Sequence, residues 1–144
     1  MSEWLKGEFT ISTEKSKLQI GVIQSFFAND SYWAQNRTLE ETKTAIEHSI
    51  CFGLYRGDAQ IGFARVVSDQ ATFAYIGDVF ILEEFRGQGL SKWVMDVIVS
   101  HPDLQGLRRW VLATRDAHGL YGQYGFGPLV HPDRWMELNA PDAY

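Results

Sequence analysis

The stretch from Asp78 to Val99 constrains the fold more than any other part of this 144-residue chain. Residues 79–82 form a short apolar run, which is typical of a strand buried on both faces. Residues 90–98 repeat apolar side chains at helical spacing and predict an amphipathic helix. Between them lies the sequence Arg86-Gly87-Gln88-Gly89-Leu90-Ser91, which predicts a tight turn from the strand into the helix.

This turn has the properties of a phosphate-binding site. A helix N-terminus leaves backbone N–H groups without partners at the positive end of the helix dipole, where anions bind. Gly87 and Gly89 let a ligand approach the bare backbone, and Arg86 adds a fixed positive charge. The turn is neither a Walker A loop, because no Gly-Lys-Ser/Thr follows, nor a Rossmann fingerprint. The sequence therefore predicts a pyrophosphate cradle.

The rest of the chain alternates strand patterns with helical ones. Tight turns between the strand patterns of residues 50–82 predict an antiparallel meander. A strand at 109–114 should lie parallel to the last meander strand, because a helix separates the two. The helices are expected at residues 16–28, 38–48, 88–100 and 117–124, and the strands at 8–13, 50–55, 60–68, 72–82, 109–114 and 134–138. The expected fold class is α/β, a mixed sheet covered by helices, in a single domain over residues 1–144.

Two motifs resemble the signatures of the GNAT superfamily of N-acetyltransferases. The turn from Arg86 to Ser91 matches the pattern R-x-x-G-x-small that follows a buried strand and opens a helix. In residues 117–126, an Ala is followed by Leu-Tyr and then by Gly-Phe, as in the second signature. The chain departs from the family at Ser91, where Gly or Ala is usual, and at Thr114, where an Asn commonly stands. The resemblance implies a GNAT-like sheet, in which an antiparallel meander is followed by two parallel strands that splay apart.

The resemblance also implies an activity and a cofactor site. The chain would transfer acetyl from acetyl-CoA directly to a primary amine of a small molecule or peptide, within a ternary complex. Pantetheine would pair with the strand at Val79, Phe80 and Ile81, with Thr114 as a further contact. A backbone N–H near Ile81 would stabilise the oxyanion, and Tyr121 matches the general acid that protonates the thiolate. The pyrophosphate would bind to Arg86, Gly87, Gln88, Gly89, Leu90, Ser91 and Lys92.

The general base has three candidates. Asp78 begins the buried strand and is the first choice, although such carboxylates often serve structure alone. His118 is a competitor, and a chain of water molecules is the third alternative. Tyr124 is the alternative acid if the helix is rotated. Trp33, Arg65 and Tyr75 are the residues expected to bind the acceptor.

Composition limits the remaining function classes. The net charge of −5 and the scattered basic residues argue against nucleic-acid binding. No apolar run approaches the length that crosses a bilayer, and the first residues lack a secretory pattern, so a cytoplasmic protein is expected. Cys51, the single cysteine, is expected to be buried and inert, and the histidines show no metal-ligand spacing. The exposed edge strands of such a sheet are compatible with a homodimer.

Two other hypotheses compete with the enzyme. The chain could be a catalytically silent module that binds acyl-CoA and reports it to a partner. Retention of Tyr121 beside the phosphate turn favours the enzyme, because a binder needs no acid at the thiolate. The third hypothesis is an unrelated α/β domain with a coincidental glycine turn.

Overall fold

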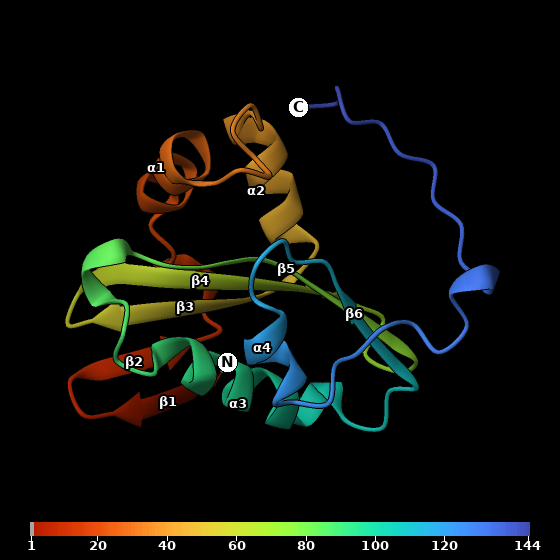
Figure 1. Cartoon of the computed structure of the whole chain (residues 1–144). Helices are drawn as coiled ribbons and strands as arrows, with labels where there is room; N and C mark the ends of the chain where they lie inside the picture. Colours follow the sequence, from red (N-terminus) through yellow and green to blue (C-terminus); the bar gives the residue numbers. More distant parts are fainter. Residues whose placement is uncertain (1) are drawn as a thin grey trace.

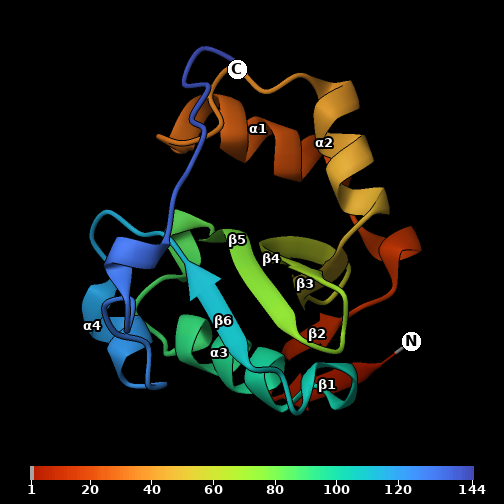
Figure 2. The ribbon, with the colours of Figure 1, turned by 90° about the vertical axis from the view of Figure 1, so that its right-hand side faces the viewer.

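A computed structural model describes residues 2–144, which form one six-stranded sheet with helices on both faces (Figures 1 and 2). The strands lie in chain order, β1-β2-β3-β4-β5-β6. Neighbours are antiparallel from β1 to β5, whereas β6 is parallel to β5. The strands are β1 Glu3–Lys6, β2 Phe9–Ser12, β3 Ile50–Arg56, β4 Ala59–Ser68, β5 Phe73–Ile81 and β6 Arg109–Leu112. The expected mixed α/β sheet is confirmed.

Four α-helices cover this sheet within residues 2–144: α1 Ile20–Asp30, α2 Leu39–Glu47, α3 Leu90–Ser100 and α4 His118–Gly122. Helices α1 and α2 lie on one face, and α3 lies on the other, with α4 beside it (Figure 2). Short 3-10 turns occur at Lys15–Lys17, Glu83–Phe85, Pro102–Leu104 and Pro132–Arg134. None of the helices in this described part of the chain is long and apolar enough to cross a membrane.

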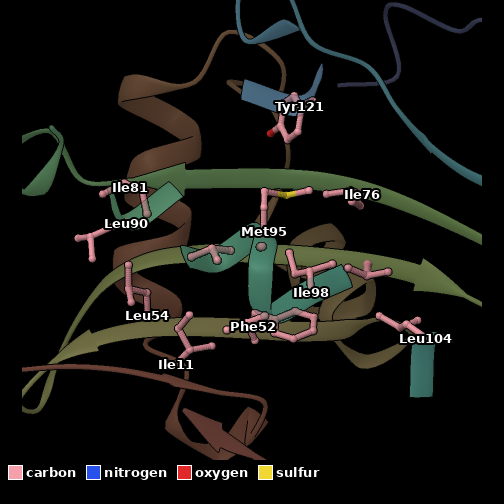
Figure 3. Close-up of a cluster of buried hydrophobic side chains, with 14 of the residues drawn as sticks. Ile11, Phe52, Leu54, Ile76, Ile81, Leu90, Met95, Ile98, Leu104 and Tyr121 are labelled. Atoms are coloured by element: carbon pink, nitrogen blue, oxygen red, sulfur yellow. The ribbon is translucent and has the colours of Figure 1, made fainter. Parts of the chain in front are cut away.

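Alternation along the central strands creates two apolar cores. Successive side chains of a strand point to opposite faces, so Phe52 and Leu54 of β3 face α3 while Cys51 faces α1. The core on the α3 face is centred on Met95 and includes Tyr121 of α4 (Figure 3). The core on the α1 face is aromatic, and Phe26 of α1 stacks on Phe80 of β5 with ring centroids 4.0 Å apart. The end of β5, residues 79–81, is therefore packed on both faces, as its apolar sequence predicts.

The start of α2 is fixed by the expected capping box. The Thr38 hydroxyl accepts a hydrogen bond from the Glu41 N–H at 3.1 Å, and the Glu41 carboxylate accepts one from the Thr38 N–H at 2.9 Å. These reciprocal bonds satisfy two donors that a helix end otherwise leaves unpaired. They also fix where the preceding loop, residues 31–38, ends.

Three element predictions need correction. Strand β1 was not expected, because its four residues are short and mostly exposed. Helix α1 begins at Ile20 rather than at residue 16 or 17, where a 3-10 turn stands instead. The strand expected at 134–138 is wrong: Pro132–Arg134 is a 3-10 turn, and the residues after it pair with no strand of the described chain. Residues 127–144, called the arm below, run clear of the sheet and return towards α1 (Figures 1 and 2).

Candidate active site

A cleft opens where β5 and β6 separate. The two strands pair only from Phe73–Arg109 to Ile76–Leu112. Strand β5 continues through Ile81, so its last five residues have no neighbouring strand on that side within residues 2–144. The N–H of Leu82 donates to the Ile61 carbonyl of β4 at 2.8 Å, and strand alternation therefore directs the Ile81 N–H away from β4, to the open side. The open edge offers free backbone donors and acceptors to an extended ligand.

A β-bulge in β5 places Asp78 at this cleft. Opposite Phe63 and Arg65 of β4 stand Phe80 and Gly77, so β5 has one extra residue between these pairs. Asp78 has a φ of +53°, a left-handed conformation that Asp adopts more readily than most residues. Bulges of this kind re-aim a side chain. Here the bulge turns the Asp78 carboxylate into a cluster of cationic and aromatic side chains.

Three donors hold the Asp78 carboxylate. Arg37 Nη1 and Arg65 Nε each donate to Oδ2 at 2.7 Å, and Trp33 Nε1 donates to Oδ1 at 2.9 Å. Burial raises the pKa of Asp78, but the hydrogen bond from Arg37 and the charges of Arg65 and Arg37 outweigh burial and lower it. A carboxylate that holds protons so weakly is poorly suited to take one from an amine. These contacts favour a positioning role for Asp78 over the role of general base.

Arg37 was missed in the sequence, although it is the most buried cationic residue of this cluster, at 7% exposure like Asp78. It lies in the loop before α2, and no pattern in the neighbouring sequence distinguishes it from an arginine exposed to solvent. Tyr144, the second residue that was missed, stacks on the Arg37 guanidinium at 4.8 Å and accepts a hydrogen bond from Nη2 at 3.1 Å. Arg65 also donates from Nη1 to the Ser49 hydroxyl at 3.1 Å.

The predicted site residues Trp33, Arg65, Tyr75, Asp78, Val79, Thr114 and Tyr121 all line one cavity of about 590 Å³. Arg37 and Tyr144 line it as well, together with Tyr32, whose ring lies 3.7 Å from the Arg115 guanidinium. The cavity follows the cleft between β5 and β6 and ends against α4. Its walls are aromatic and cationic, with two carboxylates, Asp78 and Asp116. The structure thus brings the expected acceptor and catalytic residues together.

Tyr121 is the only one of the two candidate acids that reaches the cavity. Its side chain is buried, its ring packs edge-on against Phe126, and no group among residues 2–144 bonds its hydroxyl. Burial raises the pKa of Tyr121, and the nearby Tyr32 and Asp116 add to the effect, so the phenol keeps its proton at neutral pH. Tyr124 instead points to α3, where its hydroxyl lies 2.7 Å from both the Lys92 carbonyl oxygen and Asp96 Oδ1. The geometry therefore favours Tyr121 as the acid.

His118 stands at the start of α4, exposed to solvent and outside the cavity lining. Thr114 lines the cavity, and its hydroxyl accepts a hydrogen bond from the Ala117 N–H at 3.0 Å. This bond turns the chain into α4 and leaves the Thr114 O–H free to donate. Thr114 can therefore position Tyr121 and still contact a ligand.

The glycine turn forms a second, smaller hollow of about 150 Å³ at the far end of the open edge. Gly87 and Gly89 have φ values of +79° and +77°, which glycine adopts without strain. Gly89 is the N-cap of α3, and the backbone N–H groups of residues 87–92 donate to no acceptor within the described chain. Arg86 Nε donates to the Ile81 carbonyl at 2.9 Å, which ties the turn to the end of β5. The geometry of the turn is compatible with the predicted anion site.

The predicted cofactor-binding residues of the strand and the turn differ in whether a ligand can reach their side chain or only their backbone. Phe80 and Leu90 are buried in the two cores, so only their backbone can meet a ligand, and Ile81 is likewise buried. Val79 lines the large cavity, while Ser91 and Lys92 line the hollow at the turn. Gln88 is exposed, and its amide donates to the Phe85 carbonyl at 3.3 Å. The cofactor contacts therefore come mainly from main-chain groups, with Arg86 and Lys92 adding charge.

No group of three or more His, Cys, Asp or Glu side chains among residues 2–144 is arranged to hold a metal ion. Along one cleft the site offers a strand edge without a neighbouring strand, a glycine turn with N–H groups unpaired within residues 2–144, and a protonated phenol. This arrangement suits an acyl transfer that uses an extended, phosphate-bearing donor.

Comparison with known proteins agrees with this class of site. The model of the Acetyltransferase (GNAT) family matches residues 18–126, and the chain belongs to this family. A Gibberella zeae protein proposed to be an acetyltransferase is 32% identical, over 83% of this chain and 79% of that protein. The crystal structure of a proposed GNAT acetyltransferase from Xanthomonas campestris pv. campestris is 51% identical, with a TM-score of 0.92 over 94% of this chain and 96% of that one.

A more distant structure shows the same fold. It is a Clostridium acetobutylicum protein solved with acetyl-CoA, which is 17% identical, with a TM-score of 0.64 over 91% of this chain and 96% of that one. Acetyl-CoA is the donor that the family uses. The chain is therefore an acyltransferase by family, and the fold class expected from its sequence is confirmed.

Proposed function

We propose that the protein transfers an acetyl group from acetyl-CoA to a primary amine of a small molecule or peptide by direct attack in a ternary complex. The observation that carries this proposal is the placement of Tyr121 on the cleft that runs from the acceptor cavity along the open edge of β5 to the glycine turn. One continuous cleft thus offers a binding site for the donor, a cavity for the acceptor and an acid between them.

The residues present fit the donor. N–H groups at residues 87–92, unpaired within residues 2–144, can bind a pyrophosphate. Gly87 and Gly89, both with a positive φ, have no side chain that would cover this backbone. The open edge of β5 from Gly77 to Ile81 can pair with the amides of a pantetheine arm. Acetyl-CoA supplies an activated thioester. The Ile81 N–H, directed to the open side, can donate to the carbonyl oxygen as negative charge develops there.

The proton balance involves two groups. The amine nitrogen attacks the carbonyl carbon, the carbon–sulfur bond breaks, and the sulfur takes a proton from the Tyr121 hydroxyl. The ordinary pKa values of a thiol and a phenol, about 8.5 and 10, are close enough for this exchange. The amine must be neutral to attack, and its proton leaves through water, because Asp78 is held by Arg37, Arg65 and Trp33. Asp78 then acts by fixing the two arginines and the indole that wall the acceptor cavity.

Calorimetric titration with acetyl-CoA, followed by an assay of thiol release with a panel of amines, tests the proposal. Gly89→Asp places a negative charge at the turn and should abolish binding. Gly7→Asp is the matched control, because Gly7 also has a positive φ of +59° with open space around it, and it lies in the turn between β1 and β2. Binding with no thiol release for any amine would favour the silent acyl-CoA-binding module. No binding by the unmodified chain would overturn both readings.

A further inference from the structure

Arg115 is a cation of the acceptor cavity that forms no ion pair within the described chain. Three arginines line this cavity: Arg37, Arg65 and Arg115. Arg37 and Arg65 each pair with Asp78, and Tyr144, at the end of the arm, also covers Arg37. The guanidinium of Arg115 has no carboxylate partner and donates no hydrogen bond to a described residue. Its N–H donors are therefore available to a ligand.

Tyr32 holds this guanidinium at the cavity wall. Arg115 Cζ lies 3.7 Å from the centroid of the Tyr32 ring, and the Tyr32 hydroxyl accepts a hydrogen bond from the Arg115 backbone N–H at 3.1 Å. Tyr32 packs edge-on against Trp33, with ring centroids 5.1 Å apart, and Trp33 Nε1 donates to Asp78. A free arginine side chain loses rotamer entropy when it binds a ligand. The contacts with Tyr32 lower that cost, because they order Arg115 in advance.

Arg115 belongs to the loop that leads to the candidate acid. Residues 113–117 connect β6 to α4, and Tyr121 lies within α4. Tyr32 and Asp116 are close enough to Tyr121 for their charges to raise the pKa of its phenol. Arg115 and Tyr121 also line the same cavity of about 590 Å³. A small molecule that places its amine beside Tyr121 therefore has Arg115 within the same cavity.

The phosphates of the acetyl donor are proposed to bind elsewhere. The glycine turn has its own hollow, lined by residues between Ile81 and Lys92, at the far end of the open edge of β5. Arg115 does not line that hollow. The charge of Arg115 is therefore left for the acceptor.

We infer that the acceptor is a small primary amine that also carries an acidic group, a carboxylate or a phosphate, and that Arg115 binds this group. The inference rests on the acetyl transfer proposed above, since it names the acceptor of that reaction. A guanidinium offers parallel N–H donors that match two oxygens of a carboxylate or a phosphate. The Tyr32 ring packs against the guanidinium carbon and leaves the donors at the edge of the group accessible.

The charges of the cavity favour such an acceptor over one with positive charge alone. Three arginines and two carboxylates, Asp78 and Asp116, line the cavity, which leaves one positive charge in excess. Asp116 is exposed and forms no ion pair within residues 2–144. It can attract the ammonium form of an entering amine, while the adjacent Arg115 attracts the acidic group. A diamine such as putrescine brings two positive charges and no group that complements Arg115.

Paired amines test the inference in the assay of thiol release. β-Alanine and γ-aminobutyrate are each compared with the corresponding amide, and phosphoethanolamine is compared with ethanolamine. Each pair shares an amine and differs in the acidic group. At least one acid should exceed its neutral partner about 10- to 100-fold in kcat/KM, as expected for hydrogen bonds to a charged group. The pair that shows the preference identifies the group as a carboxylate or a phosphate. Equal kcat/KM within every pair that reacts would overturn the inference and leave the acetyl transfer intact.

Arg115→Gln tests whether this residue provides the preference. Arg115 is exposed, so the variant should keep its fold, and the acid-to-neutral ratio of kcat/KM should fall to about one. The basicity of each amine is the same for every variant, so a change in the ratio reports the side chain alone. Arg115→Lys should restore part of the ratio, because lysine keeps the charge but not the planar pair of donors.

Arg108→Gln is the matched control. Arg108 is also exposed and forms no ion pair within residues 2–144, but it does not line the cavity. The acid-to-neutral ratio should therefore stay at its wild-type value in this variant. A ratio that survives in Arg115→Gln, or that falls equally in Arg108→Gln, would contradict the assignment of Arg115.

Binding measurements separate this inference from the proposed reaction. The chain is saturated with CoA, which carries no acetyl group, and is titrated calorimetrically with both members of each pair. One acid should bind at least about 10-fold more tightly than its neutral partner, and Arg115→Gln should abolish the difference. That result without thiol release in the assay would refute the acetyl transfer but retain a site for acidic amines at Arg115. Thiol release with no such difference in binding or in kcat/KM would refute the inference alone.

Discussion

Arg37 and Asp78, 41 residues apart in the chain, form an ion pair in which Nη1 lies 2.7 Å from Oδ2 and both side chains are almost fully buried. Arg65 approaches the same oxygen, so one carboxylate balances two guanidinium groups. Burying charges is costly unless each finds its partners, and the residues of this cluster line the cavity of about 590 Å³. The pair thus joins the loop before α2 to the bulge of β5 and fixes the cavity wall.

Removing the carboxylate should therefore destabilise the fold strongly. In Asp78→Asn, two guanidinium groups would face each other without a counter-charge, and the expected loss is about 3–5 kcal/mol of unfolding free energy. Urea unfolding followed by circular dichroism measures this loss. Glu40→Gln is the control, because Glu40 pairs with Lys43 on the exposed surface of α2 and its removal should leave the midpoint unchanged. Equal midpoints for both variants would show that the buried pair contributes nothing to stability.

The same cluster determines how the stability of the fold changes with pH in acid. The pKa of Asp78 is lower in the folded chain than its ordinary value of 3.8, so its contribution to stability is complete above that value and is lost as pH falls through the folded pKa. Wild-type stability should therefore fall below about pH 4 more steeply than that of Asp78→Asn. For the same reason, the pH dependence of turnover should show no titration of Asp78 between pH 5 and 8. If turnover changes with pH in this range and Asp78→Asn abolishes the change, Asp78 is the general base after all.

Sequence patterns predicted the local parts of this molecule and missed those that depend on chain folding. The strand, glycine turn and helix from Asp78 to Ser100 follow from adjacent residues, and the structure has them as expected. Arg37 and Tyr144 enter the cavity only through contacts across 41 and 107 residues, which no local pattern encodes. The bulge that aims Asp78 appears only when β4 and β5 are paired. The segment 134–138 has the alternation of a strand but pairs with no strand of the described chain.

Tyr121→Phe should lower turnover about 10²- to 10⁴-fold, which is the usual contribution of a positioned acid, while acetyl-CoA binding is retained. The hydroxyl is the only group removed, and the ring keeps its packing against Phe126. Tyr124→Phe is the matched control, because its hydroxyl bonds to α3 outside the cavity. Single-turnover assays of thiol release compare the two variants. Unchanged turnover in Tyr121→Phe would remove Tyr121 from the mechanism.

The capping box at α2 gives a prediction about stability alone. Thr38→Ala removes the acceptor for the Glu41 N–H and should cost about 1 kcal/mol of unfolding free energy. Thr44→Ala, an exposed mid-helix position of α2, is the control and should be neutral or slightly stabilising, because alanine favours a helix more than threonine does. Both are measured by urea unfolding. A larger loss for Thr44→Ala than for Thr38→Ala would contradict the assignment of the helix start.

Cys51 should be silent towards thiol reagents in the folded protein. Burial between α1 and β3 raises its pKa to about 11, and its Sγ lies 3.7 Å from the Ile46 carbonyl oxygen. Since the thiolate is the reactive form, a pKa this high leaves very little of it at pH 8, and burial blocks access to the rest. A colorimetric thiol reagent should therefore label the native chain at least 100-fold more slowly than the same chain in urea, which is the control for reagent and pH. Labelling of the native chain at the rate of the unfolded one would mean that the packing of α1 on β3 opens freely.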